Sequence, residues 1–425
     1  MTLPPAAEPA DDGAGSRVVL GVAGGIAAYK ACEVLRLLRA AGADVIVVPT
    51  EAALKFVGAA TFEALSGHPV ATGVFTDVPQ VAHVSTGRKA DLVVIVPATA
   101  DLLARAASGR ADDLLTATLL VTRAPVLMAP AMHTEMWDHP ATRANVATLR
   151  TRGTVVLDPA VGRLTGVDSG VGRLPAPESI VALALLLMQR PDALPRDLTG
   201  RRVLVTAGGT REPLDPVRYL GNRSSGKQGY AIALTAAARG AQVTLVAANT
   251  ALPAPPGVTL VPVTDARSMQ FAVEKHGREA DVVVMAAAVA DFRPLAQATT
   301  KIKKKPTAVL TGFAVELAIN PDILAGLGAA RTGPIPVLVG FAAETGDEYG
   351  SILDHGRAKL ARKGCDLLVV NGVDDGRGFE VDENAAVLLA ADGSAPIDIP
   401  LGPKTALAAV LWDQVSRLLT VVDAG

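Results

Sequence analysis

The hydrophobic positions of this chain fall into two successive series of short apolar runs, separated by segments with helical periodicity. In the first series the apolar runs are Val18–Val22, Asp44–Pro49, Ala90–Val96 and Val126–Ala129, with predicted helices at Ile26–Ala40 and Leu114–Thr122. The second series has runs at Val203–Thr206, Val243–Ala247 and Asp281–Met285 and a predicted helix at Gln228–Arg239. Continuous apolar runs of strand length predict buried parallel strands, and their alternation with helices predicts doubly wound α/β domains.

A polar stretch between the two series sets the predicted domain boundaries. Residues 191–200 contain two prolines and few apolar side chains, which is typical of a linker. Residues 1–16 are rich in Pro, Ala, Asp and Gly, so we expect a disordered tail there rather than a signal peptide. The chain is therefore predicted to hold one domain at residues 17–190 and a second at residues 201–425.

Length and composition agree with two domains and exclude some classes of partner. The 425 residues exceed one ordinary domain, and half of them are hydrophobic, which suffices for two buried cores. A net charge of −2 gives no overall attraction to nucleic acid or to an anionic membrane. The two cysteines, Cys32 and Cys365, favour a reducing cytoplasmic location over a disulfide scaffold. The most apolar runs, such as Ile180–Met188, are too short to span a membrane.

The loop after the first strand of the second series carries the densest candidate chemistry. The segment Arg201–Gly229, RRVLVTAGGTREPLDPVRYLGNRSSGKQG, combines Gly208 and Gly209 with many hydroxyl, amide and cationic side chains. Glycines let backbone N–H groups approach an anion, and hydroxyls and cations complete a phosphate cradle. The pattern indicates a site for a nucleotide or a phosphorylated substrate.

Three common site motifs fit the chain poorly. Gly221–Lys227, GNRSSGK, matches the start of a P-loop, but Gln228 replaces the Ser or Thr that binds Mg²⁺. Gly21–Lys30 lacks the Gly-x-Gly-x-x-Gly spacing of an NAD site, although its small residues suit the phosphate of a mononucleotide such as FMN. His133-Thr-Glu135 lacks the Cys-x-x-Cys of a zinc deaminase, and the six histidines show no metal-ligand spacing. The sequence therefore identifies no metal ligands, and a dehydrogenase or P-loop ATPase is a distant alternative.

Longer motifs in both halves resemble those of one family. They are GGIAAYK, Ala82-His83, PATAD, PAMHTEMW (Pro130–Trp137), GGTREPLDPVRYLGNRSSGKQG, AAAVADFRP (Ala286–Pro294), KIKKK (Lys301–Lys305), NPDIL (Asn320–Leu324) and GFAAET (Gly340–Thr345). From Arg17 to Val421 the chain resembles the bifunctional bacterial phosphopantothenoylcysteine decarboxylase/phosphopantothenate–cysteine ligases of coenzyme A biosynthesis. The resemblance implies two Rossmann-like domains with mainly parallel sheets, the first flavoprotein decarboxylase-like and the second CTP-dependent ligase-like.

For the second domain the resemblance implies that CTP, with Mg²⁺, activates 4′-phosphopantothenate as an acyl-cytidylate that cysteine then attacks. Lys301 would stabilise the activation step, and Asn222 and Arg218 would act on the acyl-cytidylate. The CTP site would comprise Ala286, Ala287, Asp291, Lys301, Asn320, Pro321, Asp322, Ile323, Phe341, Lys359 and Lys363. Cations suit the charge that develops on phosphate oxygens, and Lys359 and Lys363 would share one helix face. Taken alone, the run Lys301–Lys305 is more simply a solvated charge run.

For the first domain the resemblance implies FMN-dependent oxidative decarboxylation of phosphopantothenoylcysteine to 4′-phosphopantetheine, with His83 as the catalytic histidine. The residues that would bind FMN are Gly24, Gly25, Ile26, Ala27, Thr50, Pro97, Ala98, Thr99 and Ala100. His133 stands where the family commonly has Asn, and it can still donate a hydrogen bond to a substrate carboxylate.

Gly166 stands where the family's substrate flap often carries a cysteine. Another group, such as His133, Thr165 or Ser169, would then supply the proton, or this step would be slowed. Two alternatives stay open: a monofunctional ligase whose FMN-binding domain is structural or regulatory, and a flavin-binding interaction protein. The resemblance also implies a homo-oligomer of trimeric decarboxylase and dimeric ligase domains, together possibly a dodecamer, that binds small molecules and neither nucleic acid nor membrane.

Overall fold

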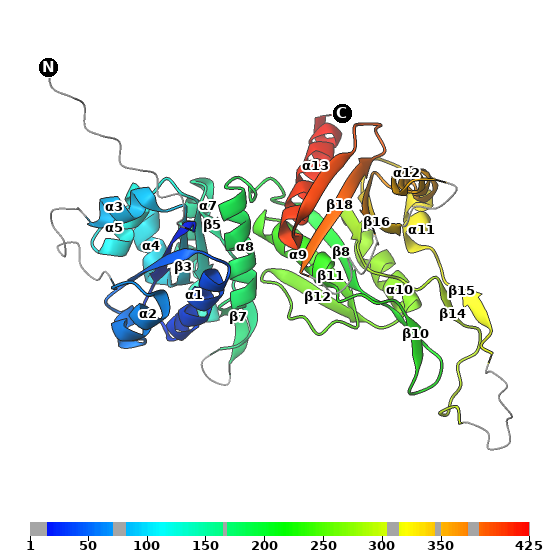
Figure 1. Cartoon of the computed structure of the whole chain (residues 1–425), viewed down its shortest axis with the longest axis horizontal. Coiled ribbons are helices and arrows are strands. Elements are labelled where there is room, and N and C mark those ends of the chain that lie inside the picture. Colours follow the sequence, from blue (N-terminus) through cyan, green and yellow to red (C-terminus); the bar gives the residue numbers. More distant parts are fainter. Residues whose placement is uncertain are drawn as a thin grey trace. The chain divides into compact units, whose positions relative to one another are not determined.

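The computed structural model describes residues 15–70, 82–164, 168–303, 314–344, 350–372 and 382–424. The chain divides into two compact units between Ala193 and Leu194, inside the polar stretch 191–200. Each unit has its own mainly parallel sheet with helices packed on it, so the predicted class of two Rossmann-like α/β domains is confirmed (Figure 1). Of the predicted tail at 1–16, residues 1–14 lie outside the described part of the chain.

The sheet of the first unit has five parallel strands in the order β2-β1-β3-β4-β5. They are β1 (Arg17–Val22), β2 (Asp44–Pro49), β3 (Leu92–Ala98), β4 (Val126–Pro130) and β5 (Val155–Val156). The helices are α1 (Ala31–Ala40), α2 (Ala59–Ser66), α3 (Ala82–Lys89), α4 (Ala100–Ser108), α5 (Leu114–Val121), α6 (Thr134–Asp138), α7 (Pro140–Thr151) and α8 (Pro177–Gln189). The predicted helix Ile26–Ala40 is interrupted, because a 3₁₀ turn, η1 (Ile26–Lys30), precedes α1.

The main sheet of the second unit has eight strands in the order β12-β11-β8-β13-β16-β17-β18-β19. They are β8 (Arg202–Gly208), β11 (Gln242–Ala248), β12 (Val258–Val263), β13 (Val282–Met285), β16 (Val337–Glu344), β17 (Leu367–Gly372), β18 (Glu383–Ala390) and β19 (Ile397–Pro403). The strands from β12 to β17 run parallel, and β18 and β19 add an antiparallel edge.

Two apolar cores cover the two faces of this sheet. Alternate residues of β8 show the division, since Val203 and Val205 belong to one core and Leu204 to the other. The first core is closed by α9 (Lys227–Ala238) and α13 (Lys404–Ala424), and the second by α10 (Ala266–Gly277), α11 (Ile323–Ala330) and α12 (Ile352–Lys363). Side chains of a strand alternate between faces, so a continuous apolar run is what a sheet covered on both sides requires.

By length and composition alone, helix α13 is long and apolar enough to cross a membrane. This helix is not among the elements predicted from the sequence, where only shorter apolar runs are considered. Its buried residues Leu407, Leu411 and Trp412 belong to the core beside α9. The indole Nε1 of Trp412 donates a hydrogen bond to the carbonyl of Ile232 on α9 at 3.0 Å. These contacts make α13 a core helix of the second unit.

A buried arginine fastens the stretch that precedes β8 to this core. Arg239 follows α9, is 1% exposed, and donates hydrogen bonds to the carboxylates of Asp197 and Asp413 and to the carbonyl of Ala409. Leu198 is fully buried, and its N–H donates to the carbonyl of Arg239 at 3.3 Å. The segment that the sequence assigns to a linker is therefore partly an integral piece of the second unit.

Replacing Arg239 with Met is expected to destabilise the second unit by about 3 kcal/mol, because it leaves two carboxylates without their buried partner. The free energy of unfolding is measured by urea unfolding followed by tryptophan fluorescence. A Trp137→Phe background is used, so that the fluorescence comes from Trp412 in the second unit. The control is Arg202→Met, whose pair with Glu279 is exposed and contributes about 0–1 kcal/mol. Equal stability of the two variants would contradict the prediction.

Candidate active sites

In both sheets the strand order reverses at one point, and this determines where ligands bind. The chain runs outward from β1 to β2 and then returns to β3 on the other side of β1. In the second unit it runs outward from β8 through β11 to β12 and then returns to β13. In open α/β sheets the crevice outside the carboxyl ends of the strands at such a reversal is the ligand site.

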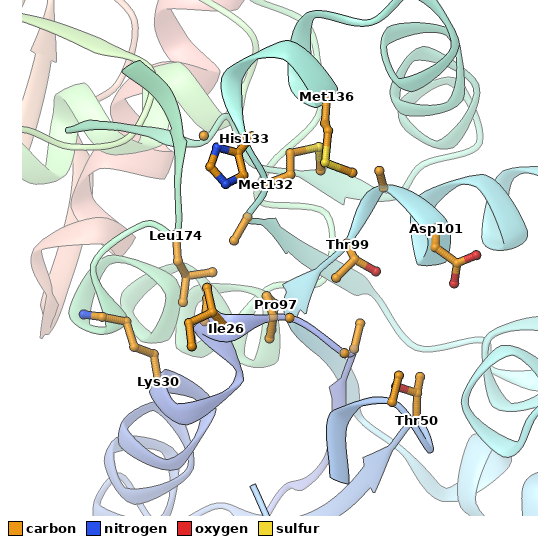
Figure 2. Close-up of a pocket in the computed structure, with 18 of the residues that line it drawn as sticks. Ile26, Lys30, Thr50, Pro97, Thr99, Asp101, Met132, His133, Met136 and Leu174 are labelled. Atoms are coloured by element: carbon orange, nitrogen blue, oxygen red, sulfur yellow. The ribbon is translucent and has the colours of Figure 1, made fainter. Parts of the chain in front are cut away.

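A cavity of about 1190 Å³ lies at the reversal point of the first unit. Of the nine residues predicted to bind FMN, all but Ala98 line it; Ala98 is fully buried in β3. Figure 2 shows where residues that line the cavity come from: Ile26 and Lys30 come from the turn after β1, Thr50 from the end of β2, and Pro97 and Thr99 from the end of β3. Segments far apart in the sequence thus meet at one carboxyl edge.

The turn after β1 depends on a close approach that a side chain would prevent. A Cβ on Gly24 would lie 2.4 Å from the Cβ of Ala52 and 2.8 Å from its carbonyl carbon. Thr50, which is buried, donates its N–H to the carbonyl of Val22 at 2.9 Å and accepts the N–H of Ala53 with its hydroxyl at 3.2 Å. Thr99 caps α4 by accepting the N–H of Leu102 at 3.3 Å. These contacts leave a recess lined by backbone and small side chains, which is suitable for a phosphate or an aromatic ring.

A hairpin, β6 (Ala160–Arg163) and β7 (Ser169–Arg173), closes onto the segment that carries His133. The N–H of Met132 donates to the carbonyl of Gly172 at 2.9 Å, and His133 and Met132 line the cavity (Figure 2). A Cβ on Gly172 would lie 2.1 Å from the carbonyl oxygen of Met132. Thr165 and Gly166 lie outside the described residues, Ser169 is exposed, and His83 lies on α3 with its side chain outside the described part.

Other residues line this cavity although no individual function is predicted for them from the sequence. They include Lys30, Arg105, Met132, Met136 and Leu174. Arg105 donates to Asp112 at 3.0 Å and to Asp113 at 2.6 Å. Burial raises the pKa of Asp113, but hydrogen bonds from Arg105 and Thr116 outweigh it and hold this pKa below its usual range. The Arg105 cluster therefore remains ionised at neutral pH.

At the reversal point of the second unit, several predicted CTP-site residues are fastened to one another. Ala286 and Ala287 directly follow β13, and Phe341 lies on β16. Asn320 is 6% exposed; its N–H donates to the carbonyl of Asp291 and its side-chain amide to the carbonyl of Ala290, each at 2.8 Å. The segments Ala286–Asp291 and Asn320–Ile323 therefore form one edge.

The start of α11 and the end of α12 contribute the charged part of this edge. Asp322 caps α11 by accepting the N–H of Ala325 at 3.1 Å, and it is paired with Lys363 of α12. Burial raises the pKa of Asp322, but the hydrogen bonds from Lys363 and the Ala325 N–H and the charges of Lys363 and Arg362 together outweigh it, so the pKa lies below its usual value. Lys359 precedes Lys363 on α12, while Pro321 and Ile323 flank Asp322. The described residues contain no group of three or more His, Cys, Asp or Glu that would hold a metal ion.

Two buried threonines, Thr206 in β8 and Thr210 in the loop after it, connect this part of the chain to the segment Ala286–Asp291. The hydroxyl of Thr206 accepts the N–H of Ala287 at 3.1 Å, and that of Thr210 accepts the N–H of Ala290 at 2.9 Å. Asn222 joins the same edge, since its amide donates to the carbonyl of Val289 at 3.1 Å. Both threonines lie in the motif GGTREPLDPVRYLGNRSSGKQG or just before it, but only the fold reveals their function.

Arg218 contacts the segment that carries Lys301, although the two are remote in sequence. Arg218 precedes β10 (Tyr219–Gly221), which pairs with β9 (Arg211–Pro213), and its guanidinium donates to the carbonyl of Ile302 at 3.1 Å. Lys301 is exposed, and Lys304 and Lys305 of the predicted run lie outside the described residues.

Known proteins resemble this chain in both units. The family profile Flavoprotein matches residues 6–188, and the profile DNA/pantothenate metabolism flavoprotein C-terminal domain matches residues 198–419. The coenzyme A biosynthesis bifunctional protein CoaBC of Mycobacterium bovis is 63% identical over 408 residues, covering 95% of this chain and 97% of that protein. The CoaBC proteins of Mycolicibacterium smegmatis and Escherichia coli K12 are 62% and 42% identical, covering 96% and 95% of this chain and 99% and 97% of their own length.

Replacing Gly172 with Ala is expected to loosen the hairpin, because the new Cβ would collide with the Met132 carbonyl. Trypsin should then cleave after Arg163 and Arg173 at least about fivefold faster, since proteolysis follows local opening. The control is Gly153→Ala, because Gly153 shares a positive φ (+87°) but has no neighbour within 4 Å. Unchanged cleavage in the Gly172 variant would refute a fastened hairpin.

Proposed function

The chain belongs to the CoaBC family of bifunctional decarboxylase/ligase enzymes in coenzyme A biosynthesis, and we propose that each reversal point holds one of the two activities. The flavoprotein domain carries the decarboxylase and the C-terminal domain carries the ligase. One observation supports this assignment of one activity to each domain. At each carboxyl edge, segments remote in sequence come together, and they carry residues of the family motifs. The ligase forms phosphopantothenoylcysteine from 4′-phosphopantothenate and cysteine, and the decarboxylase converts it to 4′-phosphopantetheine.

In the ligase domain, we infer that CTP and Mg²⁺ are the nucleotide and metal. Nucleotidyl transfer increases negative charge on the phosphate oxygens, and preorganised cations stabilise that charge best. Arg218 contacts the carbonyl of Ile302 beside Lys301, and Lys363 of α12 is paired with Asp322 at this edge. We infer that these cations, together with Lys359 one turn earlier on α12, stabilise that charge. Asn222 is held against the strand end by its bond to Val289, where its amide can contact the activated carboxylate.

In the first domain, we infer that the cavity at the reversal point holds FMN. The glycine turn after β1, Thr50 and the segment Pro97–Ala100 would hold the nucleotide, and the recess beside Gly24 has no room for a larger side chain. Bound FMN supplies the two-electron chemistry that lets a cysteine carboxylate leave as CO₂. His133 lines the cavity and would donate a hydrogen bond to the substrate carboxylate, and His83 would move a proton.

The thiol chemistry of the family's flap has no substitute among this chain's cysteines. Neither Cys32 nor Cys365 lines the cavity. Burial raises the pKa of the Cys32 thiol, and it raises that of Cys365 to about 11. Both thiols are therefore protonated at neutral pH and poor nucleophiles. We infer that another group in the cavity donates the proton that the flap cysteine supplies in the family. His133 is the candidate, because its imidazole can carry and donate a proton.

We also infer a cytoplasmic homo-oligomer, trimeric in the decarboxylase and dimeric in the ligase. Large apolar side chains are exposed beside both sites: Ile26 and Tyr29 in the first domain, and Tyr219 and Phe292 in the second. Apolar surface of this kind is typical of a subunit interface.

Mass-spectrometric product analysis tests the bifunctional assignment directly. Purified protein is incubated with 4′-phosphopantothenate, cysteine, Mg²⁺ and CTP. We expect 4′-phosphopantetheine to accumulate. Arrest at phosphopantothenoylcysteine would instead support the monofunctional alternative, in which the flavoprotein domain is structural or regulatory.

Lys301→Gln is expected to lower CMP formation by about 100-fold or more, because a cation aimed at developing phosphate charge is lost. CO₂ release from supplied phosphopantothenoylcysteine should not change. Lys303→Gln is the matched control from the same exposed run. If both variants keep parental CMP formation, the run is merely solvated charge and the assignment fails.

The double variant Cys32→Ala/Cys365→Ala is expected to release CO₂ within about twofold of the parental rate, because neither protonated thiol takes part. CMP formation by the same protein controls for damage to the ligase core around Cys365. A tenfold loss of CO₂ release with intact CMP formation would show that a thiol is required.

A further inference from the structure

Asp215 is a fully buried carboxylate in the turn between β9 and β10. One of its oxygens accepts the N–H groups of Val217 and Arg218 at 2.7 and 2.8 Å. The other accepts the N–H of Ile302 at 3.2 Å and lies 3.6 Å from the Arg218 guanidinium. Both oxygens are thus occupied by groups of this chain, so Asp215 has no free atom for a substrate.

The Asp215 carboxylate remains ionised in this environment. Burial raises its pKa, but the three backbone N–H donors and the Arg218 charge outweigh burial and hold the pKa below its ordinary value. An ionised carboxylate accepts hydrogen bonds with both oxygens, so it suits a site where every neighbour is a donor. An amide side chain would place its own NH₂ donor against one of these donors.

These bonds join two segments that the sequence separates widely. The segment Ala298–Lys303 has no regular secondary structure, so no helix or sheet ladder fixes Lys301. Within the described residues, three hydrogen bonds connect it to Leu214–Arg218. They run from Ala298 N–H to the Leu214 carbonyl at 3.0 Å, from Ile302 N–H to Asp215, and from Arg218 to the Ile302 carbonyl. Asp215 takes part in the second bond and, through Arg218, orients the third.

We propose that Asp215 is a positioning residue of the ligase, which holds Arg218 and the Lys301 segment in one arrangement so that both cations reach the same reacting group. The inference rests on the proposed function of Lys301 and Arg218. A lysine on an unfastened exposed segment must be ordered in each turnover, whereas a fastened one acts without that entropy cost. Asp215 therefore acts through Lys301 and not on the substrate.

The test is a double-mutant cycle in the full-length protein between Asp215→Asn and Lys301→Gln, with CMP formation as readout. Asp215→Asn alone is expected to lower kcat by about 30-fold and to change KM for CTP by less than about threefold, since the interaction lost is made in the transition state. In the Lys301→Gln background it should lower kcat by less than about threefold, because residues that act as a unit are not additive.

Glu212→Gln is the matched control. Glu212 is a buried acid on the same two-stranded ribbon, but it accepts the N–H of Ala266 on α10, and among the described residues its side chain makes no hydrogen bond to the Lys301 segment. We expect any loss it causes to be equal in the two backgrounds. Thermal unfolding checks that the second domain of each variant is folded, and CO₂ release from supplied phosphopantothenoylcysteine checks that the first domain is unaffected.

If Asp215→Asn does not fold, Ile302→Pro tests the same connection from the other side, because proline lacks the N–H that Asp215 accepts. The same loss of kcat, again absent in the Lys301→Gln background, is expected. Equal losses in both backgrounds would overturn the positioning function of Asp215 while leaving that of Lys301 intact. Parental CMP formation by Lys301→Gln alone would overturn the proposed function of Lys301, and the inference would fall with it.

Discussion

Strand order reverses once in each main parallel sheet, and the location of both sites follows from these two reversals. Where the chain turns back past β1 or β8, neighbouring connections leave in opposite directions and cannot fill the crevice between them. The carboxyl ends of the strands then deliver loop residues to a common edge. In the first domain this edge surrounds a large recess, and in the second it carries the amides of Asn222 and Asn320 and the Lys363–Asp322 ion pair.

Loops that meet at such an edge have backbone groups without ladder partners, and buried groups of this kind must be satisfied. In the ligase domain, buried polar side chains provide the partners: Thr206 and Thr210 for the end of β13, Asn320 for the segment that follows, and Asp215 for the Lys301 segment. The exposed side chains that we propose to meet substrate are thus on segments held by buried side chains. This division would keep the proposed cations solvated while their backbone is fixed.

The two domains solve the positioning problem differently. The flavoprotein domain relies on close backbone contacts, as at Gly24 and Gly172, where a Cβ would collide with a neighbouring segment. The ligase domain relies on hydrogen bonds from buried side chains across segments remote in sequence. The first arrangement suits a large planar cofactor that stays bound, and the second suits substrates that are bound, activated and released in each turnover.

The sequence by itself determined the α/β class, most strand positions and the family, because apolar runs and contiguous motifs are local patterns. Of the nine residues predicted to bind FMN, eight line one cavity, and Ala98 is buried in the core. Only the tertiary structure decided the functions of Asp215, Thr206, Thr210 and Arg239, and the burial of α13. Each depends on contacts with segments remote in sequence, as between Arg239 and Asp413 or Trp412 and Ile232. No local pattern encodes which distant backbone group a buried polar side chain will meet, because the topology of the whole sheet sets that pairing.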